Sequence, residues 1–315
     1  MEMTQPLEQA EAAEALAIDL TAVIVAVTAE QPRVLALEGG RALPSGPFQS
    51  RHRSLQQGAR AWVEEQTRYP LGYVEQLYTF ADRGRTSDGA LGRVVSISYL
   101  GLTRERAGAA SAAAGWHSWY GYFPWEDWRG GPPAVVSDAI LPRLDAWVES
   151  APSETRRERR QRIAVNFAPS GRAWNEEFVL QRYELLWEAG LVPESGKDAP
   201  SNLSLGMAMT HDHRRILATG IARLRAKIKY RPVVFELMPA SFTLLQLQRT
   251  VEALAGRRLH KQNFRRLIES QGLVEETGEV STGTGGRPAK LFRFRGEVVV
   301  ERTAAGSKLP LHRSG

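Results

Sequence analysis

The segments SFTLLQLQRTVEALAG (241–256) and HKQNFRRLIESQG (260–272) decide how this chain is read. Each has apolar residues at helical spacing, and each ends at a glycine, the residue that most often terminates a helix. Thr243 is placed to cap the first helix. Two short helices joined by a tight turn predict a helix-turn-helix.

The second helix has the composition of a recognition helix. Its polar side chains can donate hydrogen bonds to base edges and phosphates in a DNA major groove. Its apolar residues Phe264, Leu267 and Ile268 are expected to anchor the opposite face. The candidate DNA-binding residues in this part of the chain are Thr243, Lys261, Gln262, Asn263, Arg265 and Arg266.

A hairpin is predicted directly after these helices. The strand-like runs LVEETGEV (273–280) and KLFRFR (290–295) flank a glycine-rich tip that carries Arg287, and Lys290 follows at its end. Glycines add no side-chain bulk, so such a tip can approach a phosphate backbone or the minor groove. We interpret the hairpin as the wing of a winged helix; an ordinary surface hairpin is the alternative. RNA binding is disfavoured because no paired aromatic stacking motif is present.

Charge is distributed unevenly along the chain. Residues 206–315 carry 20 Lys and Arg against 9 Asp and Glu, whereas the rest carries the remaining 21 against 26, for a net charge of +6. A cationic end on a mildly anionic body favours a polyanion-binding module. The absence of cysteine excludes disulfides, thiol catalysis and Cys-ligated metals. The acidic start of the chain and the lack of a long apolar run predict a cytoplasmic protein.

The first hundred residues read as a mixed α/β layer structure. The run LTAVIVAVTAEQPRVLALEG (20–39) predicts a hairpin, and SLQQGARAWVEEQT (54–67) predicts a helix capped by Ser54. Strands are predicted at 72–80 and 93–102.

The middle of the chain is less regular. Four tryptophans lie between Trp116 and Trp128, where they line a pocket, form an interface or pack against a sheet. We predict helices at 139–150, 175–189 and 211–230, a solvated helical face at 154–162 and a strand at 163–169. His211 and His213 are interpreted as capping or packing residues rather than as metal ligands. The polar segment SGKDAPSN (195–202) is the clearest linker, so we divide the chain into residues 1–203, with an insertion at about 134–202, and residues 204–315.

The segment 43–80 resembles a Nudix box, the motif in which carboxylates on one helix hold magnesium on a diphosphate. The first Glu of that motif is here Arg53, its Arg-Glu pair is Ala61 and Trp62, and its Glu-Glu pair is Glu65 and Gln66. One carboxylate among arginines suits a bound phosphate better than a divalent metal, which implies that catalysis is lost and that no metal is held. The candidate ligand-binding residues are Arg51, Arg53, Arg60, Glu65, Phe80 and Tyr99. Solvated arginines and core aromatic residues are the alternatives.

Residues 20–130 and 205–296 are similar to the NrtR family of Nudix-related transcriptional regulators of NAD metabolism. The segments that carry the resemblance include GYVEQLYTFAD (72–82), GRVVSISYLGL (92–102), the 231–279 stretch and GRPAKLFRF (286–294). The resemblance implies an α+β fold, in which a Nudix-like α/β/α sandwich precedes a winged helix-turn-helix. It also implies a homodimer that represses NAD biosynthesis or salvage genes from a palindromic operator. ADP-ribose or a related nucleotide would release the operator, and no cofactor would be required. An active ADP-ribose pyrophosphatase and a sugar-responsive regulator remain as alternatives.

Overall fold

A mixed β-sheet forms the centre of the computed structural model, which describes residues 16–82, 93–106, 111–169, 173–197, 205–281 and 288–297. Its strands run in the order β4-β5-β1-β2-β6, and β3 pairs with β1. The strands are β1 (Leu16–Thr28), β2 (Gln31–Leu37), β3 (Ser45–Pro47), β4 (Tyr73–Phe80), β5 (Arg93–Leu102) and β6 (Ala114–Ser118). The predicted hairpin is confirmed, because β1 and β2 pair antiparallel around Ala29 and Glu30; β1 and β5 pair parallel.

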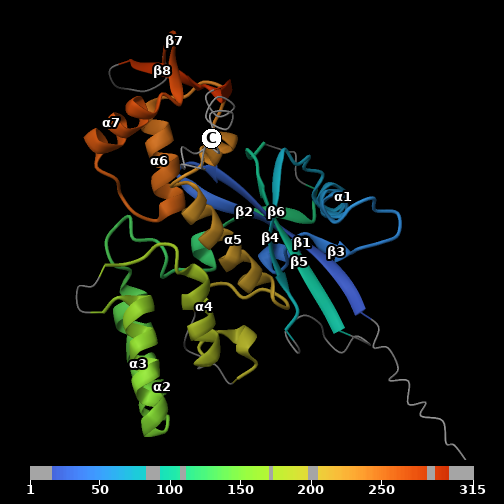
Figure 1. Cartoon of the computed structure of the whole chain (residues 1–315), viewed down its shortest axis with the longest axis vertical. Helices are drawn as coiled ribbons and strands as arrows, with labels where there is room; N and C mark the ends of the chain where they lie inside the picture. The colour runs from blue at the N-terminus through green and yellow to red at the C-terminus, as the bar shows by residue number, and fades with distance from the viewer. Residues whose placement is uncertain are drawn as a thin grey trace, which may run out of the picture.

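Helices cover both faces of this sheet. Helix α1 (Leu55–Thr67) lies on one face, and α5 (His213–Lys227) lies on the other (Figure 1). The predicted cap of α1 is confirmed, since the Ser54 side chain accepts a hydrogen bond from the Gln57 amide. Helix α5 packs closely on β1, because a Cβ added at Gly220 would lie 3.0 Å from Val23. The layers are therefore α1, the sheet and α5.

The position of α5 bears on where the chain divides. The sequence pattern placed this helix in the 204–315 unit, but α5 contacts β1, β4 and β5. The segment that follows it, η5 (Val233–Leu237), leads into the C-terminal helices. We therefore propose that the structural boundary lies between α5 and η5 rather than at residue 203.

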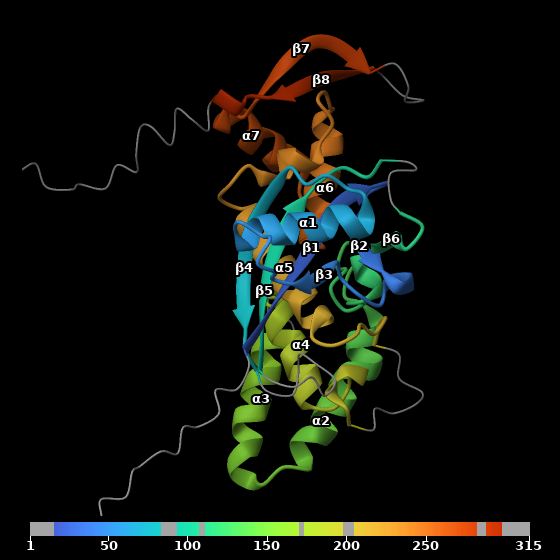
Figure 2. The ribbon, with the colours of Figure 1, turned by 90° about the vertical axis from the view of Figure 1, so that its right-hand side faces the viewer.

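The middle of the chain is helical. It forms η3 (Val136–Ile140), α2 (Leu141–Glu149), α3 (Ser153–Phe167), α4 (Val179–Glu188) and η4 (Pro193–Ser195). Figure 2 shows α2 and α3 as a helical hairpin that projects away from the sheet, while α4 packs on α5. The predicted strand at 163–169 is wrong. Ile163 and Phe167 are four residues apart, so they share one face of α3 and are both buried.

The tryptophan-rich segment packs this helical part against the sheet. Trp119 and Trp125 are fully buried, and the ring of Trp128 lies 4.2 Å from that of Trp174, between centroids. Trp116 lies on β6 and meets Tyr69 edge to face. The segment thus belongs mainly to the core.

A helix-turn-helix and a two-stranded hairpin complete the fold, as predicted. These are α6 (Leu244–Ala255), α7 (Lys261–Gln271), β7 (Val274–Ser281) and β8 (Ala289–Phe294). Gly256 and Gly272 end the two helices in the left-handed conformation, with φ of 71° and 58°. The ring of Phe235 stacks on that of Phe294 at 4.2 Å, which ties the hairpin to η5. Across the described ranges, no helix combines the length and the apolar content needed to cross a bilayer.

Candidate nucleic-acid interface and ligand pocket

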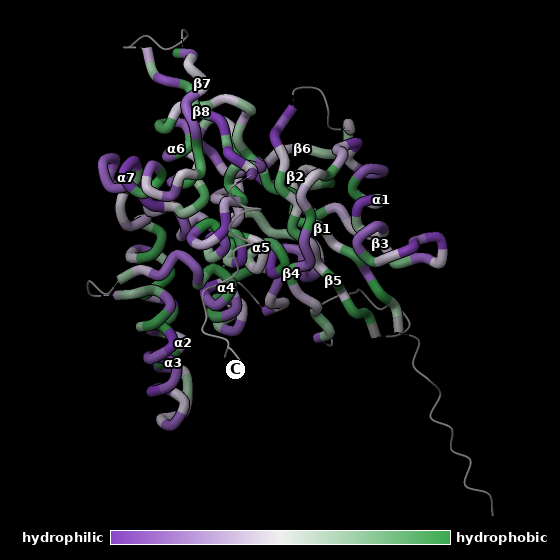
Figure 3. Tube along the Cα trace, turned by 45° about the horizontal axis from the view of Figure 1, so that its top comes forward, coloured by the Kyte–Doolittle hydropathy of each residue, from purple (hydrophilic) through white to green (hydrophobic). Residues whose placement is uncertain are grey.

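Helix α7 presents a polar face to solvent. Its exposed residues include Lys261, Gln262, Asn263, Arg265 and Arg266. The buried Phe264 and Ile268 hold its other face, and in Figure 3 the tube of α7 is largely purple. One predicted anchor is wrong: Leu267 is 53% exposed, because it lies between the two faces. The arrangement leaves hydrogen-bond donors free to enter a groove.

Thr243 occupies the start of α6 and is buried. Its hydroxyl accepts a hydrogen bond from the Gln246 amide at 3.1 Å, and the Gln246 side chain accepts one from the Thr243 amide at 2.7 Å. This reciprocal pair satisfies two helix donors that otherwise lack partners. The structure thus gives Thr243 a capping role.

The hairpin is less cationic than its sequence suggests. Lys290 donates to both carboxylate oxygens of Glu276, at 2.8 and 3.0 Å, and Arg293 donates to Glu275 at 2.5 Å. All these side chains are largely exposed, so a phosphate has to compete with the carboxylates of β7. Arg287, the other predicted wing contact, lies outside the described residues.

The arginines of the Nudix-like box point in different directions. Arg51 lies 3.7 Å from Glu65, and both side chains are 60% exposed. Arg60 donates to the carbonyl oxygens of Leu71 and, at 2.8 Å, of Gly72, so it holds the segment between α1 and β4. Arg53 is exposed at the start of α1.

The two candidate aromatic residues lie on opposite faces of the sheet. Phe80 is 1% exposed in the cluster that faces α5, where the Arg215 guanidinium lies 4.7 Å from its ring centre. Tyr99 is 3% exposed and packs in a cluster with Ala59 of α1. The structure does not bring the six candidate ligand-binding residues together.

A cavity of about 430 Å³ lies elsewhere, between β1, the end of β2, α1 and the start of α5. We call it the sheet pocket. Its polar and titratable lining residues are Asp19, Thr21, Glu38, Ser45, Gln66, Ser96, Thr210, His211, Asp212 and His213. They come from segments up to 194 residues apart in sequence, which the fold brings to one end of the central strands.

Hydrogen bonds fix several of these side chains. The Thr21 hydroxyl donates to Asp19 at 3.1 Å, and burial raises the pKa of the Asp19 carboxyl. The Nδ1 atom of His213 accepts a hydrogen bond from the Leu43 amide at 3.0 Å. Burial, assisted by the nearby His211, lowers the pKa of His213 to about 4, so its ring is neutral at pH 7.

Gln66 stands where the Nudix resemblance expects a metal-binding carboxylate. Its amide holds the Ser45 backbone, with the nitrogen donating to the carbonyl at 2.8 Å and the oxygen accepting from the amide at 3.1 Å. Within the described part of the chain, no three or more His, Asp or Glu side chains are grouped so as to hold a metal. The donor set at this site therefore does not fit the magnesium ions of a Nudix hydrolase.

Sequence reasoning missed the sheet pocket. Asp19 lies just before the predicted hairpin (20–39) and Glu38 lies near its end, and neither was singled out. His211 and His213 were assigned to capping or packing, and the hydrogen bond to Leu43 gives His213 such a role. No local pattern links these positions, because their proximity depends on how α5 crosses the sheet.

The comparisons with known proteins bear most directly on the C-terminal part. Residues 234–294 match the model of the NrtR DNA-binding winged helix domain. The winged helix belongs to the NrtR family.

One curated relative is named ADPR responsive transcriptional repressor NtrR, from Acinetobacter baylyi. It is 41% identical over 91 residues, which cover 29% of this chain and 36% of the relative. The match thus spans about a third of that relative's length.

Two solved structures share the whole fold. Shewanella oneidensis NrtR, solved with a 27mer DNA, has a TM-score of 0.54 at 20% identity, covering 90% of this chain and 95% of that one. A MutT/nudix family protein from Enterococcus faecalis has a TM-score of 0.52 at 16% identity, covering 94% and 90%. The predicted fold class, a Nudix-like domain followed by a winged helix, is confirmed.

Proposed function

We propose that this chain is a transcriptional repressor that binds double-stranded DNA through its NrtR-type winged helix. The observation that carries the proposal is the exposed face of α7, on which amide and guanidinium donors stand above the buried anchors Phe264 and Ile268. In a major groove, Asn and Gln suit adenine and Arg suits guanine.

The contacts divide by type in this proposal. Lys261, Gln262 and Asn263, in the first turn of α7, read base edges together with Arg266, while Arg265 supports phosphate contact. Lys290, with Arg287 on the wing, contacts the phosphate backbone. Thr243 contributes by fixing the start of α6, against which α7 is placed.

The repressor responds to a small molecule. A curated relative of part of this chain is named for its response to ADP-ribose, and we propose ADP-ribose or a related nucleotide as the effector here. The sheet pocket suits the ribose end of such a ligand, because the Asp19 and Glu38 carboxylates accept hydrogen bonds from sugar hydroxyls. Arg51, Arg53, Arg60 and Glu65 stay as candidates for a phosphate at the surface of α1. Arg51, Arg53 and Glu65 are exposed and can meet a ligand from solvent, whereas Arg60 is half-buried and already donates to two carbonyl oxygens. Phe80 and Tyr99 would act through packing.

We infer that the ligand is bound without being hydrolysed, because α1 lacks the carboxylates that would hold magnesium. Glu65 is exposed beside Arg51, and Gln66 supplies an amide where a carboxylate would be needed. The proposed protein is therefore a sensor and not an enzyme, and it needs no metal or cofactor.

A sugar-responsive regulator is the second candidate, and the lining of the sheet pocket favours it. Among the described residues that line the pocket there is no Lys or Arg, whereas Asp19, Glu38 and Asp212 are acidic. Such a lining accepts hydrogen bonds from hydroxyls but does not attract a diphosphate. The two candidates share the DNA-binding function and differ in the effector.

Calorimetric titration of the full chain separates them. ADP-ribose, NAD, nicotinamide mononucleotide and simple sugars are titrated in turn, with and without magnesium. Asp19→Asn is expected to weaken binding of the effector, while Asp138→Asn, the same change at an exposed position, leaves its affinity unchanged. Binding of sugars alone would replace the nucleotide effector by the second candidate. Magnesium-dependent release of AMP from ADP-ribose would overturn the non-enzymatic assignment.

A homodimer on a palindromic operator completes the proposal. A single helix-turn-helix contacts too few base pairs to find one site in a genome, so two copies related by a two-fold axis are needed. This function places the protein in the cytoplasm with the chromosome. Sedimentation and footprinting test the assembly; a monomer that binds an asymmetric site with full affinity would contradict it.

A further inference from the structure

A second cavity lies within the C-terminal part of the molecule. It has a volume of about 670 Å³ and is enclosed by the end of α5, η5, α6 and α7. We call it the helix cavity. Most of its wall is apolar, with Val234, Phe235, Leu247, Phe264 and Ile268 among the lining residues. Cavities of this size and character hold small organic ligands.

The charged residues of the helix cavity are mainly cationic. Arg225, Lys229, Arg231 and Arg257 line it, against the single carboxylate of Glu176. Glu176 is shared, because its oxygens lie 2.8 Å from Lys229 and 3.6 Å from Arg257. Lys229 also contacts the Glu177 carboxylate at 2.6 Å. Two carboxylates do not balance the four cations of the lining, so an excess of positive charge faces the cavity.

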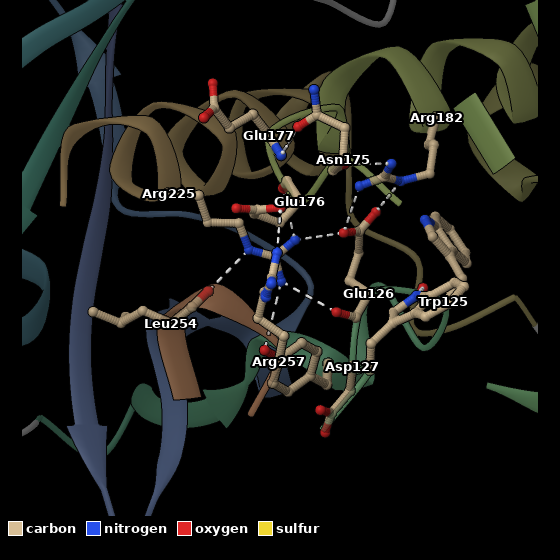
Figure 4. A network of polar contacts seen from close by, with 12 residues as sticks. Trp125, Glu126, Asp127, Asn175, Glu176, Glu177, Arg182, Arg225, Leu254 and Arg257 are labelled. Carbon is tan, nitrogen blue, oxygen red and sulfur yellow. Dashed lines mark hydrogen bonds and ion pairs between the residues drawn. The ribbon is translucent and has the colours of Figure 1, made fainter. Parts of the chain in front are cut away.

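The buried network around Arg225 does not cancel this excess. Arg225 and Arg182 are fully buried and share the Glu126 carboxylate, with Arg225 at 2.5 Å and Arg182 at 2.5 and 2.9 Å. Figure 4 shows the two guanidinium groups around this one carboxylate, with Leu254 accepting from Arg225. Two buried cations on one anion leave a net positive charge in a medium of low dielectric constant, which favours a nearby anion.

We propose that the helix cavity binds a small amphipathic anion. The apolar or aromatic body of the ligand fills the space between α6 and α7, and its acidic group lies at the rim formed by Lys229, Arg231 and Arg257. This site is separate from the sheet pocket, shares no lining residue with it, and does not depend on the effector assigned above.

Occupation of the helix cavity affects DNA binding through α7. Phe264 and Ile268, the buried anchors of α7, form part of the wall, and Leu247 and Val251 of α6 form another part. A ligand held between these side chains changes how α7 is supported, and with it the affinity for DNA.

The test uses full-length protein and two fluorescent probes. The anionic probe is 8-anilinonaphthalene-1-sulfonate, and the neutral probe is N-phenyl-1-naphthylamine, which has the same rings without the sulfonate. We expect saturable binding of the anionic probe at one site per chain. Val251→Phe places a ring in the cavity and abolishes that site. Leu245→Phe adds the same ring to the same helix at a position 46% exposed and outside the cavity, and it leaves binding unchanged.

A charge variant keeps the test informative if Val251→Phe does not fold. The Arg257 side chain is 55% exposed, so Arg257→Gln is a surface change. We expect it to weaken binding of the anionic probe about two- to fivefold, the range of an exposed charge pair, and to leave binding of the neutral probe unchanged. Equal weakening of both probes would overturn the proposal, as would equal effects of the two phenylalanine variants. A shift of the monomer–dimer equilibrium in Val251→Phe, with probe binding intact, would instead make the cavity an interface between two copies and would also overturn it.

Discussion

Glu126→Gln tests whether the buried network of Glu126, Arg182 and Arg225 holds the C-terminal helices in place. The Glu126 side chain is 1% exposed, and its two oxygens accept three hydrogen bonds of 2.5–2.9 Å from the two guanidinium groups. Its backbone oxygen accepts a fourth from Arg225 at 3.2 Å. The substitution leaves two buried cations without an anion. Breaking a buried pair in this way costs about 3–5 kcal/mol of unfolding free energy.

The assay is urea unfolding followed by tryptophan fluorescence, since Trp125 precedes Glu126 and is fully buried. Glu149→Gln is the matched control, because that carboxylate is 58% exposed and pairs with Arg156 and Arg160 on the surface of the helical hairpin. We expect the control to cost less than about 1 kcal/mol.

Removal of one of the two cations provides a second test of the same network. In the Glu126→Gln background, Arg182→Met takes away one of the two uncompensated charges while keeping much of the side-chain volume. We expect part of the lost stability to return. The reasoning fails if Glu126→Gln and Glu149→Gln cost the same, or if Arg182→Met adds its own loss to that of Glu126→Gln.

Three further predictions concern pH, backbone conformation and salt. Because the pKa of His213 falls from 6.5 to about 4 on folding, the unfolded chain binds the proton more tightly, and stability drops by up to about 3 kcal/mol as the pH falls from about 6.5 to about 4. His213→Asn keeps a hydrogen-bond acceptor and should flatten this part of the stability profile; an unchanged slope would contradict the assignment. Gly256→Ala places a Cβ 2.5 Å from the Glu126 carbonyl oxygen, at a φ of 71°. Gly272→Ala has its nearest atom 4.0 Å away and should lose only the about 1–2 kcal/mol of unfolding free energy that left-handed backbone strain costs. The loss of unfolding free energy in Gly256→Ala should therefore be the larger of the two. Equal losses in the two thermal melts would show that the contact is relaxed. Lys290→Ala should flatten the salt dependence of binding to random DNA by about one unit of slope, and an unchanged slope would mean that this ammonium does not reach a phosphate.

Local patterns were sufficient for most of the elements. Two β-branched runs around Val23 and Val34, separated by a turn that contains Pro32, predicted the first hairpin, and the caps Ser54 and Thr243 marked the starts of two helices. The run that begins at Ile163 was misread as a strand because short apolar runs look alike in strands and helices. The charged residues before this run belong to the same helix, so the run forms the last part of α3.

The sheet pocket required tertiary information. Asp19, Gln66 and His213 come together only because the end of α1 and the start of α5, which cover opposite faces of the sheet, both lie near the start of β1. The helix-turn-helix was readable because its function lies on one short helix, whose spacing separates exposed donors from buried anchors. A site built from one element can be predicted from sequence, whereas one built from four cannot.

The central claim, that α7 reads DNA sequence, is tested most directly by the affinity of Asn263→Ala for two duplexes. One duplex is selected from a random pool by the full-length protein, the other is its scrambled version, and Ser270→Ala at the far end of α7 is the control. We predict that Asn263→Ala weakens binding to the selected duplex by about 1–3 kcal/mol and leaves binding to the scrambled duplex unchanged. Ser270→Ala should bind both duplexes as the unaltered protein does. Equal loss on both duplexes, or no loss on either, would contradict the claim.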